Sequence, residues 1–231
     1  MRVNLKVSSR ANLAVRRARK KLNFGILLAI KMFAHFQKSF LLALPVDLST
    51  CTASYGHIDV VLRHLIGFAN SHIVRSMEYL LMSTYYGNYQ KNRVGFEKLF
   101  RDLSDAKWDH AIELIKHVTT RGGSMKFTPP DFLNTEEPNV YEGYEIQSIA
   151  KALDKEKQLA LEAFKVHNEA SRRTDGKHDP EISSYIEEEF VHHQAKNIRK
   201  LAGYVTDLKS MLSGPDGSLS LFLFDEYLKS Q

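Results

Sequence analysis

Polar side chains interrupt the apolar stripes of four segments whose hydrophobic residues recur at helical spacing. His72 lies seven residues after Leu65 and seven before Tyr79, so the three share one helix face. The other interrupting residues are Lys107 and His110, Glu156, and Gln194. Each lies near the middle of its segment, and the middles of antiparallel helices share one layer. The sequence therefore predicts a buried polar layer.

The chemistry of this layer depends on how its charges are neutralised, because a buried charge is costly unless it is paired or binds a metal. Di-iron sites in helical bundles use a Glu from each of two helices and Glu-x-x-His from the other two. Here Lys107 stands where the Glu of a motif ending at His110 would be, and an ammonium cannot ligate a metal. We favour a structural ion pair between Lys107 and Glu156, with His110 and Gln194 as hydrogen-bonding neighbours. A weak single-metal site and a working di-iron oxidase centre are the alternatives.

Three carboxylates form a second candidate site on another face of the second segment. Asp102, Asp105 and Asp109 are spaced three and four residues apart, so they line up within two helical turns. Like charges at this spacing repel one another unless a cation binds, and carboxylates are hard oxygen ligands suited to iron. The alternative is a solvated acidic face.

The elements that must position these residues are helices. The stripes span about residues 57–83, 96–117, 149–167 and 186–208, and Asp179 and Pro180 suit the N-cap and first position of the fourth helix. Residues 124–140 contain three prolines and no period, which indicates a long connection. Short loops elsewhere make antiparallel neighbours. We predict an all-α four-helix bundle with a long crossover between helices 2 and 3 and a short fifth C-terminal helix over about residues 218–228.

The charge is divided unevenly along the 231-residue chain. Residues 1–46 hold ten of the 32 Lys and Arg residues and none of the 27 Asp and Glu residues, which leaves 22 basic and 27 acidic residues, a net charge of −5, for the rest. We expect residues 1–50 to be a basic leader, either signal-like or a disordered extension, and residues 51–231 to be the bundle domain. A transit sequence and a signal peptide starting at Met32 both remain open. A nucleic-acid or anionic-membrane docking function would rest wholly on this leader.

Several function classes are excluded by composition and motif. The single cysteine, Cys51, rules out an internal disulfide framework and a multi-cysteine zinc site. The apolar runs at residues 22–30 and 39–46 are far shorter than the roughly 20 residues that span a bilayer. No glycine-rich phosphate loop and no nucleophile–base arrangement is present.

From about residue 57 to residue 230 the chain resembles a ferritin, most of all the insect-type secreted light-chain homologues. The segments that carry the resemblance are Tyr79-Leu80-Leu81-Met82-Ser83, His110-Ala111, Arg121-Gly122-Gly123, Glu156-Lys157, His178-Asp179-Pro180, Gln194-Ala195-Lys196, Leu201-Ala202-Gly203 and Leu223-Phe224-Asp225-Glu226-Tyr227. The resemblance implies a ferritin-like bundle in a shell of 24 subunits that takes up Fe²⁺ and stores a ferric mineral. In such shells heavy-type subunits oxidise Fe(II) and light-type subunits favour mineral nucleation.

The resemblance also implies residue roles. His110, Glu156 and Gln194 match members of the ferroxidase centre, and His72 and Lys107 stand at positions where the family has Glu. We therefore expect no catalytic residues, although weak residual ferroxidase activity stays open. Further roles are implied for Asp102, Asp105 and Asp109 as cavity-facing nucleation candidates, and for Glu187 and His167 as channel candidates, with Ser184 where an acid is usual.

These observations lead to a main functional hypothesis and an alternative. The first is a light-type iron-storage subunit that co-assembles with a ferroxidase-active heavy-type chain. The alternative is a ferroxidase-active ferritin that oxidises Fe(II) at a reduced di-iron site. We expect a secretory or extracellular location, with the cytoplasm as the alternative, and Cys51 could pair with a partner subunit or stay free.

Overall fold

The computed structural model describes residues 51–127, 143–172 and 176–231. The predicted leader and most of the predicted crossover lie outside these residues. Residues Thr52–Gln231 form one compact unit, and its described part consists of helices joined by loops, with no strand.

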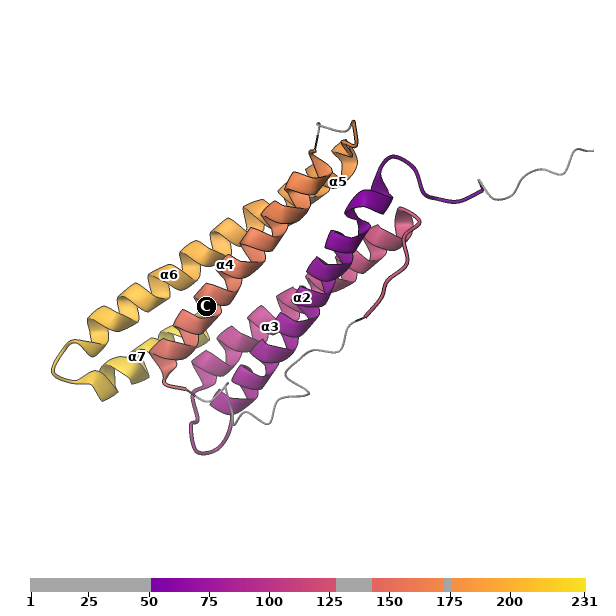
Figure 1. Cartoon of the computed structure of the whole chain (residues 1–231). Coiled ribbons are helices and arrows are strands. Elements are labelled where there is room, and N and C mark those ends of the chain that lie inside the picture. Colours follow the sequence, from indigo (N-terminus) through magenta and orange to yellow (C-terminus); the bar gives the residue numbers. More distant parts are fainter. Residues whose placement is uncertain (1–50, 128–142, 173–175) are drawn as a thin grey trace, which may run out of the picture. The chain divides into compact units, whose positions relative to one another are not determined.

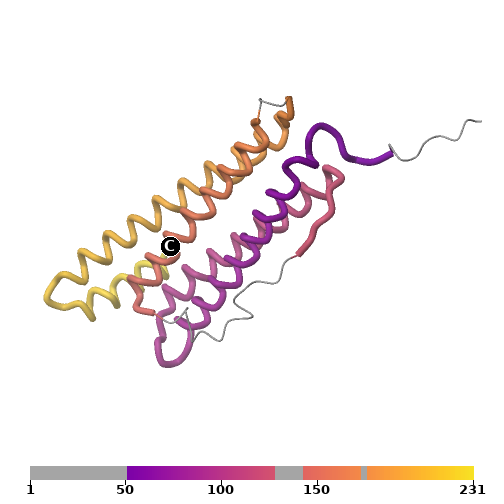
Figure 2. Tube along the Cα trace, viewed as in Figure 1, coloured from indigo at the N-terminus to yellow at the C-terminus, as the bar shows by residue number. Residues whose placement is uncertain are grey.

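Two antiparallel helical hairpins build the bundle. The first contains α2 (Ile58–Tyr86) and α3 (Val94–Thr120). The second pairs α4 (Glu145–Ala170) with a fourth helix in three parts: α5 (Pro180–Ile186), a π-helical turn η3 (Glu187–Val191), and α6 (His192–Leu212). A shorter helix, α7 (Gly217–Ser230), follows at one end. Figures 1 and 2 show the two hairpins lying side by side, with α7 turned across the end of the bundle.

The end of α3 and the start of α4 lie at opposite ends of the bundle. At one end, Arg121 at the end of α3 contacts Asp179 at the start of α5. At the other end, Arg93 at the start of α3 contacts Glu145 at the start of α4 over 3.4 Å. Since α3 ends at one end of the bundle and α4 begins at the other, the predicted crossover is confirmed.

The ends of the helices follow the sequence signals. Gly122 has a φ of +79° and follows α3, where a Cβ would lie 2.6 Å from Ser54 Oγ, so only glycine fits this turn. The predicted N-cap is also confirmed: Asp179 accepts a hydrogen bond from the Ile182 backbone N–H, and Pro180 occupies the first turn.

The fourth helix differs from the prediction of one continuous α-helix. Ile186, Phe190 and Gln194 follow one another at four-residue steps, and all three are buried. Four-residue steps drift around an α-helix of 3.6 residues per turn. The wider π turn at η3 absorbs this drift, so the three side chains stay on the core face.

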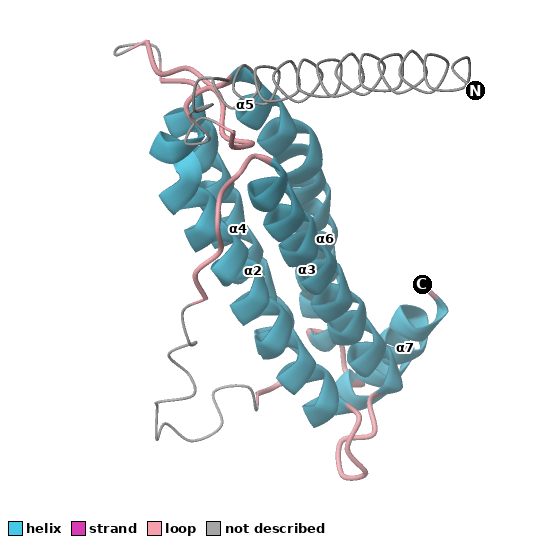
Figure 3. Ribbon diagram, turned by 90° about the vertical axis from the view of Figure 1, so that its right-hand side faces the viewer, coloured by secondary structure: helices cyan, strands magenta, loops and turns pink. Residues whose placement is uncertain are grey.

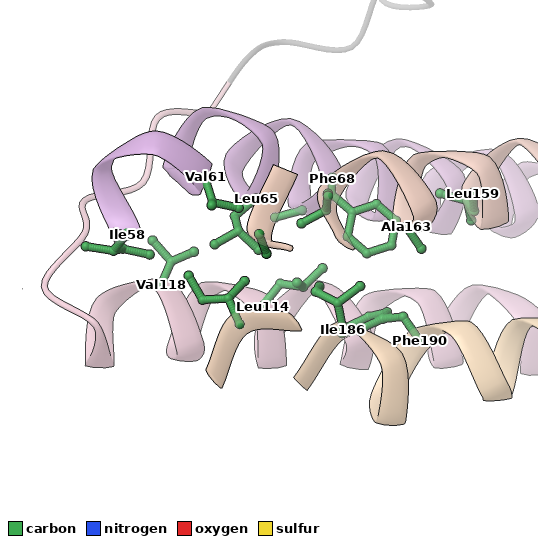
Figure 4. Close-up of a cluster of buried hydrophobic side chains, with 14 residues drawn as sticks. Ile58, Val61, Leu65, Phe68, Leu114, Val118, Leu159, Ala163, Ile186 and Phe190 are labelled. Carbon is green, nitrogen blue, oxygen red and sulfur yellow. The ribbon is translucent and has the colours of Figure 1, made fainter. Parts of the chain in front are cut away.

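The core consists of two hydrophobic clusters with polar residues between them. One cluster fills the end near Ile58 and includes Leu65, Phe68 and Phe190 (Figure 4). The other fills the end near α7 and includes Tyr86, Phe96 and Phe224. On α2, His72 and Ser76 lie between the segments that enter these two clusters. In the part of the chain that the structure describes, no helix is long and apolar enough to cross a membrane.

The docking of α7 depends on one close backbone approach and one carboxylate. Asp225 on α7 is buried, and its Oδ1 accepts a hydrogen bond of 3.0 Å from the backbone N–H of Phe96 in the first turn of α3. A Cβ on the neighbouring Gly95 would lie 1.9 Å from the Asp225 carbonyl oxygen. Asp225 therefore caps α3 from another helix, and Gly95 gives it room.

Candidate functional site

A lysine–glutamate contact lies at the centre of the polar layer. Lys107 Nζ on α3 is 2.7 Å from Glu156 Oε2 on α4, and neither side chain has exposed surface. Lys107 Nζ also donates to Gln194 Oε1 over 3.4 Å, and Gln194 Nε2 donates to Glu156 Oε2 over 2.5 Å. Gln194 Nε2 lies 2.8 Å from the Glu156 carbonyl oxygen as well. Three helices thus place one ammonium, one carboxylate and one amide in mutual contact.

Tyr79 on α2 completes the hydrogen bonds to this carboxylate. Its hydroxyl donates to Glu156 Oε1 over 2.8 Å and approaches the Ala152 carbonyl oxygen at 3.3 Å. Burial, and then the negative charge of Glu156, raise the pKa of the Tyr79 hydroxyl well above its usual value. Tyr79 therefore stays protonated as a donor, and both oxygens of Glu156 have donors within hydrogen-bond distance.

Two histidines form the adjoining part of the layer. The His72 ring has no exposed surface, and its centroid lies 5.5 Å from that of His110. The Phe68 ring packs edge-on against His72 at 4.6 Å, and the Phe190 ring contacts both histidines. Among the described residues, both ring nitrogens of His72 lack a hydrogen-bond partner, and so does Nδ1 of His110. Both imidazoles therefore pack mainly through contacts with other rings.

The electrostatics of this pair follow from burial and from the nearby ammonium. Burial, and then the charge of Lys107, lower the pKa of His72 well below its usual value. The same two causes, in the same order, lower the pKa of His110 to about 4. Both rings are therefore neutral at neutral pH.

The layer's donor set can be compared with that of a metal centre. Lys107, Glu156 and Gln194 are joined by the ion pair and its hydrogen bonds, whereas His72 and His110 contribute ring contacts. The hydrogen bond expected of His110 is not among the contacts of the described residues. Among the residues described, no group of three or more His, Cys, Asp or Glu side chains is placed to hold a metal ion. The contacts that the described residues make here are an ion pair and its hydrogen bonds.

Two buried serines beside this layer carried no signal in the sequence. Ser104 Oγ on α3 donates to the Ser76 carbonyl oxygen on α2 over 2.8 Å, and the two hydroxyls lie 3.4 Å apart. Both are buried, next to the layer. A serine side chain is small and finds a nearby hydrogen-bond acceptor at a helix–helix contact. A buried serine therefore does not stand out in the hydrophobic pattern of the sequence.

The three aspartates of α3 lie apart from the polar layer. Asp102, Asp105 and Asp109 are all exposed, and Arg101 Nε contacts Asp105 Oδ2 over 3.1 Å. One of the three carboxylates is therefore partly neutralised by its own helix.

The channel candidates lie near the joint between α4 and the fourth helix. His167 Nε2 is 3.8 Å from Glu187 Oε2 and 3.0 Å from Ser183 Oγ. Ser183 Oγ in turn lies 2.9 Å from Ser171 Oγ, while Ser184 contacts Glu188 instead. The structure thus brings Glu187 and His167 together and adds Ser183, which the sequence analysis missed.

A cluster around Arg121 was also missed. Its guanidinium contacts Asp179 Oδ2 at 2.7 Å, the Glu181 carboxylate and, at 3.0 Å, the Tyr55 carbonyl oxygen. The Tyr55 ring lies against the same guanidinium at 4.1 Å. The backbone N–H of His57 completes the cluster by donating to Asp179. Arg121 therefore ties the segment before α2 to the ends of α3 and α5.

A four-helix bundle with a lengthwise crossover, a fifth helix and a central polar layer defines the ferritin-like class of proteins. The ferritin-like domain of the ferritin family matches residues 69–211, more than half of the chain. The chain therefore belongs to the ferritin family, whose members store iron in oligomeric shells.

Individual relatives agree with this membership. The ferritin light chain of Trichoplusia ni is 46% identical over 195 residues, which is 81% of this chain and 83% of that protein. The ferritin light chain of Drosophila melanogaster is 42% identical over 186 residues, covering 79% and 82% of the two chains. The crystal structure of Trichoplusia ni secreted ferritin superposes with a TM-score of 0.72 at 45% identity, covering 82% of this chain and 91% of that one.

Proposed function

We propose that this chain is a light-type ferritin subunit, which stores iron without oxidising it rapidly. The observation that carries the proposal is the contact between Lys107 Nζ and Glu156 Oε2 at 2.7 Å in a fully buried position. The ammonium contacts the carboxylate directly, and it repels a dication. Tyr79 and Gln194 donate to the same carboxylate, so binding Fe²⁺ there would break several buried hydrogen bonds.

The fast oxidation step then belongs to a second kind of subunit. We infer that the chain co-assembles, in a shell of 24 subunits, with a heavy-type ferritin that has a complete oxidation centre. The light-chain names of the two insect relatives support this assignment. Iron is the cargo of the shell in this account and is not a cofactor of the bundle.

Mineral formation would start at the exposed carboxylates of α3. Asp102, Asp105 and Asp109 present hard oxygen ligands to solvent on one helix face. Glu187 and His167, which contact each other, are our candidates for the lining of an iron-entry channel. His110, Glu156 and Gln194 are on this account remnants of an oxidation centre.

The N-terminal part of the chain would act in targeting. We propose that residues 1–50 are a leader separate from the bundle domain of residues 51–231, and that the leader directs the chain to the secretory pathway. The secreted ferritin of Trichoplusia ni supports this location. Cys51 is exposed and free in this structure, so it is available to a partner subunit.

The replacement Lys107→Glu tests the proposal. It removes the ammonium and supplies the carboxylate that a Glu-x-x-His motif would have, so aerobic Fe(II) oxidation by the purified chain should become faster. Lys107→Gln is the matched control, because it removes the charge and adds no carboxylate. If Lys107→Glu gives no gain over the wild type while the shell stays intact, Lys107 does not block the site. Fast oxidation by the wild type would favour the ferroxidase alternative.

A further inference from the structure

A groove lies between α2 and α4, which are neighbours in Figure 3. It has a volume of about 590 Å³ and is lined by polar side chains from both helices. Arg63, His64 and Ser71 come from α2, and Glu162 and Lys165 come from α4. The groove is separate from the Lys107–Glu156 contact, and only the buried Phe68 ring, which packs on His72, belongs to both regions.

Among the residues that the structure describes, the two permanent cations of this groove have no carboxylate partner. Arg63 and Lys165 are exposed, and neither forms an ion pair within the described residues. Arg75 and Lys155, on the same two helices, both contact Glu78. Even Glu162, which lies in the groove, is not in salt-bridge contact with either cation. Two unpaired cations facing one hollow from two helices create a positive field there.

A glycine lies on the surface of the groove. Gly67 lies in the interior of α2, and a Cβ added to it would meet no atom within 4 Å. Glycine weakens the interior of a helix, and here no close packing requires it. At Gly95, by contrast, a Cβ would collide with the backbone of α7. What Gly67 does provide is space on the groove surface.

We propose that this groove binds a small anion carrying two or more carboxylate or phosphate groups. Arg63 offers a planar guanidinium that can bind such a group through two hydrogen bonds, and Lys165 offers a point charge from the facing helix. Ser71 and His64 add further hydrogen-bonding groups. Glu162 would repel a ligand that placed its charge centrally, which favours a molecule whose anionic groups are separated. The proposal is independent of iron storage.

The test is calorimetric titration of the iron-free assembled protein with citrate and, separately, with pyrophosphate. The two probes distinguish a carboxylate from a phosphate ligand, and uncharged glycerol gives the background. We expect at least one anion to bind, and the double replacement Arg63→Gln/Lys165→Gln to weaken it roughly tenfold or more, because it removes charged donors. Gly67→Leu should weaken binding to a similar degree, since it fills the hollow and leaves every charge in place.

The matched control is Lys116→Gln/Lys196→Gln, which removes two exposed positive charges from α3 and α6. It should leave binding within about twofold of the wild type, since it keeps both groove cations. Equal loss in this control would mean that the anion responds only to net charge, and the proposal would be wrong. It would also be overturned if neither anion binds the wild type, or if Gly67→Leu binds as the wild type does.

Discussion

Lys107 Nζ and Glu156 Oε2 lie 2.7 Å apart in the middle of the bundle, and both side chains are fully buried. A buried pair of this kind adds little net stability, because desolvation offsets most of the attraction, whereas breaking it is costly. The pair's main consequence is therefore chemical: it gives the carboxylate a permanent partner at the position that we propose as the remnant of an oxidation centre.

The first prediction concerns the cost of removing one partner of the Lys107–Glu156 pair compared with removing both charges. Lys107→Met should destabilise the bundle by about 3–5 kcal/mol, because it leaves Glu156 charged and unpaired in the core. The double replacement Lys107→Met/Glu156→Gln should recover most of that loss. Chemical denaturation followed by circular dichroism gives both values. Arg101→Ala breaks the exposed pair with Asp105 and should cost at most about 1 kcal/mol. A double variant as unstable as Lys107→Met would contradict the ion-pair account.

The second prediction concerns acid stability. The folded-state pKa of His72 lies below its unfolded value, and that of His110 is about 4. Between those folded-state pKa values and about pH 6.5, the unfolded chain binds more protons than the folded chain. The free energy of unfolding therefore falls as the pH drops through that window. His72→Leu should flatten the decline in melting temperature between about pH 6.5 and 4. Phe190→Leu alters the ring packed on His72 without removing a titratable group, so it should leave the slope unchanged. An equal effect of both changes would argue against His72 titration as the cause.

The third prediction compares two helical glycines that have different surroundings. Gly95→Ala places a Cβ 1.9 Å from the Asp225 carbonyl oxygen, so α7 must move away from α3. Gly203→Ala in α6 meets nothing within 4 Å and should stabilise the helix by about 0.5–1 kcal/mol. Limited proteolysis should cut α7 much faster in Gly95→Ala than in the wild type or in Gly203→Ala. Equal cleavage rates would show that α7 does not depend on this approach.

The fourth prediction concerns the segment before α2. Arg121→Ala leaves Asp179 without its guanidinium partner and removes the contact to the Tyr55 carbonyl. We expect faster hydrogen exchange in residues 55–58 and a loss of about 3–5 kcal/mol in unfolding free energy. Arg172→Ala removes an exposed pair with Glu169 and should change neither quantity measurably. Unchanged exchange near Tyr55 in Arg121→Ala would mean that other contacts hold the segment.

Much of the fold could be predicted because its signals are periodic. The helices, the crossover and the fifth helix follow from apolar spacing and from breakers such as Gly122 and Pro180. The π turn could not be predicted as such, because the four-residue steps of Ile186, Phe190 and Gln194 also fit an ordinary amphipathic helix. Packing against the other three helices determines whether the segment stays a regular α-helix, in which these side chains would rotate off the core face, or forms a π turn.

The polar layer was partly visible for a similar reason. Lys107 and Glu156 are conspicuous on apolar stripes, and helix length alone places them at one level. Ser104 and Arg121 gave no such signal, since the first is small and the second follows the helix end. Their partners, Ser76 and Asp179, are 28 and 58 residues away, and only the folded chain brings them into contact.

The most direct test of the central claim is the rate of aerobic Fe(II) oxidation by the purified chain alone, measured beside Glu156→Ala. The shell should be shown to be intact in both by size-exclusion chromatography. The account predicts a slow rate that the replacement does not change, because the buried carboxylate is held by Lys107 and binds no iron. A fast, saturable rate that disappears in Glu156→Ala would contradict it.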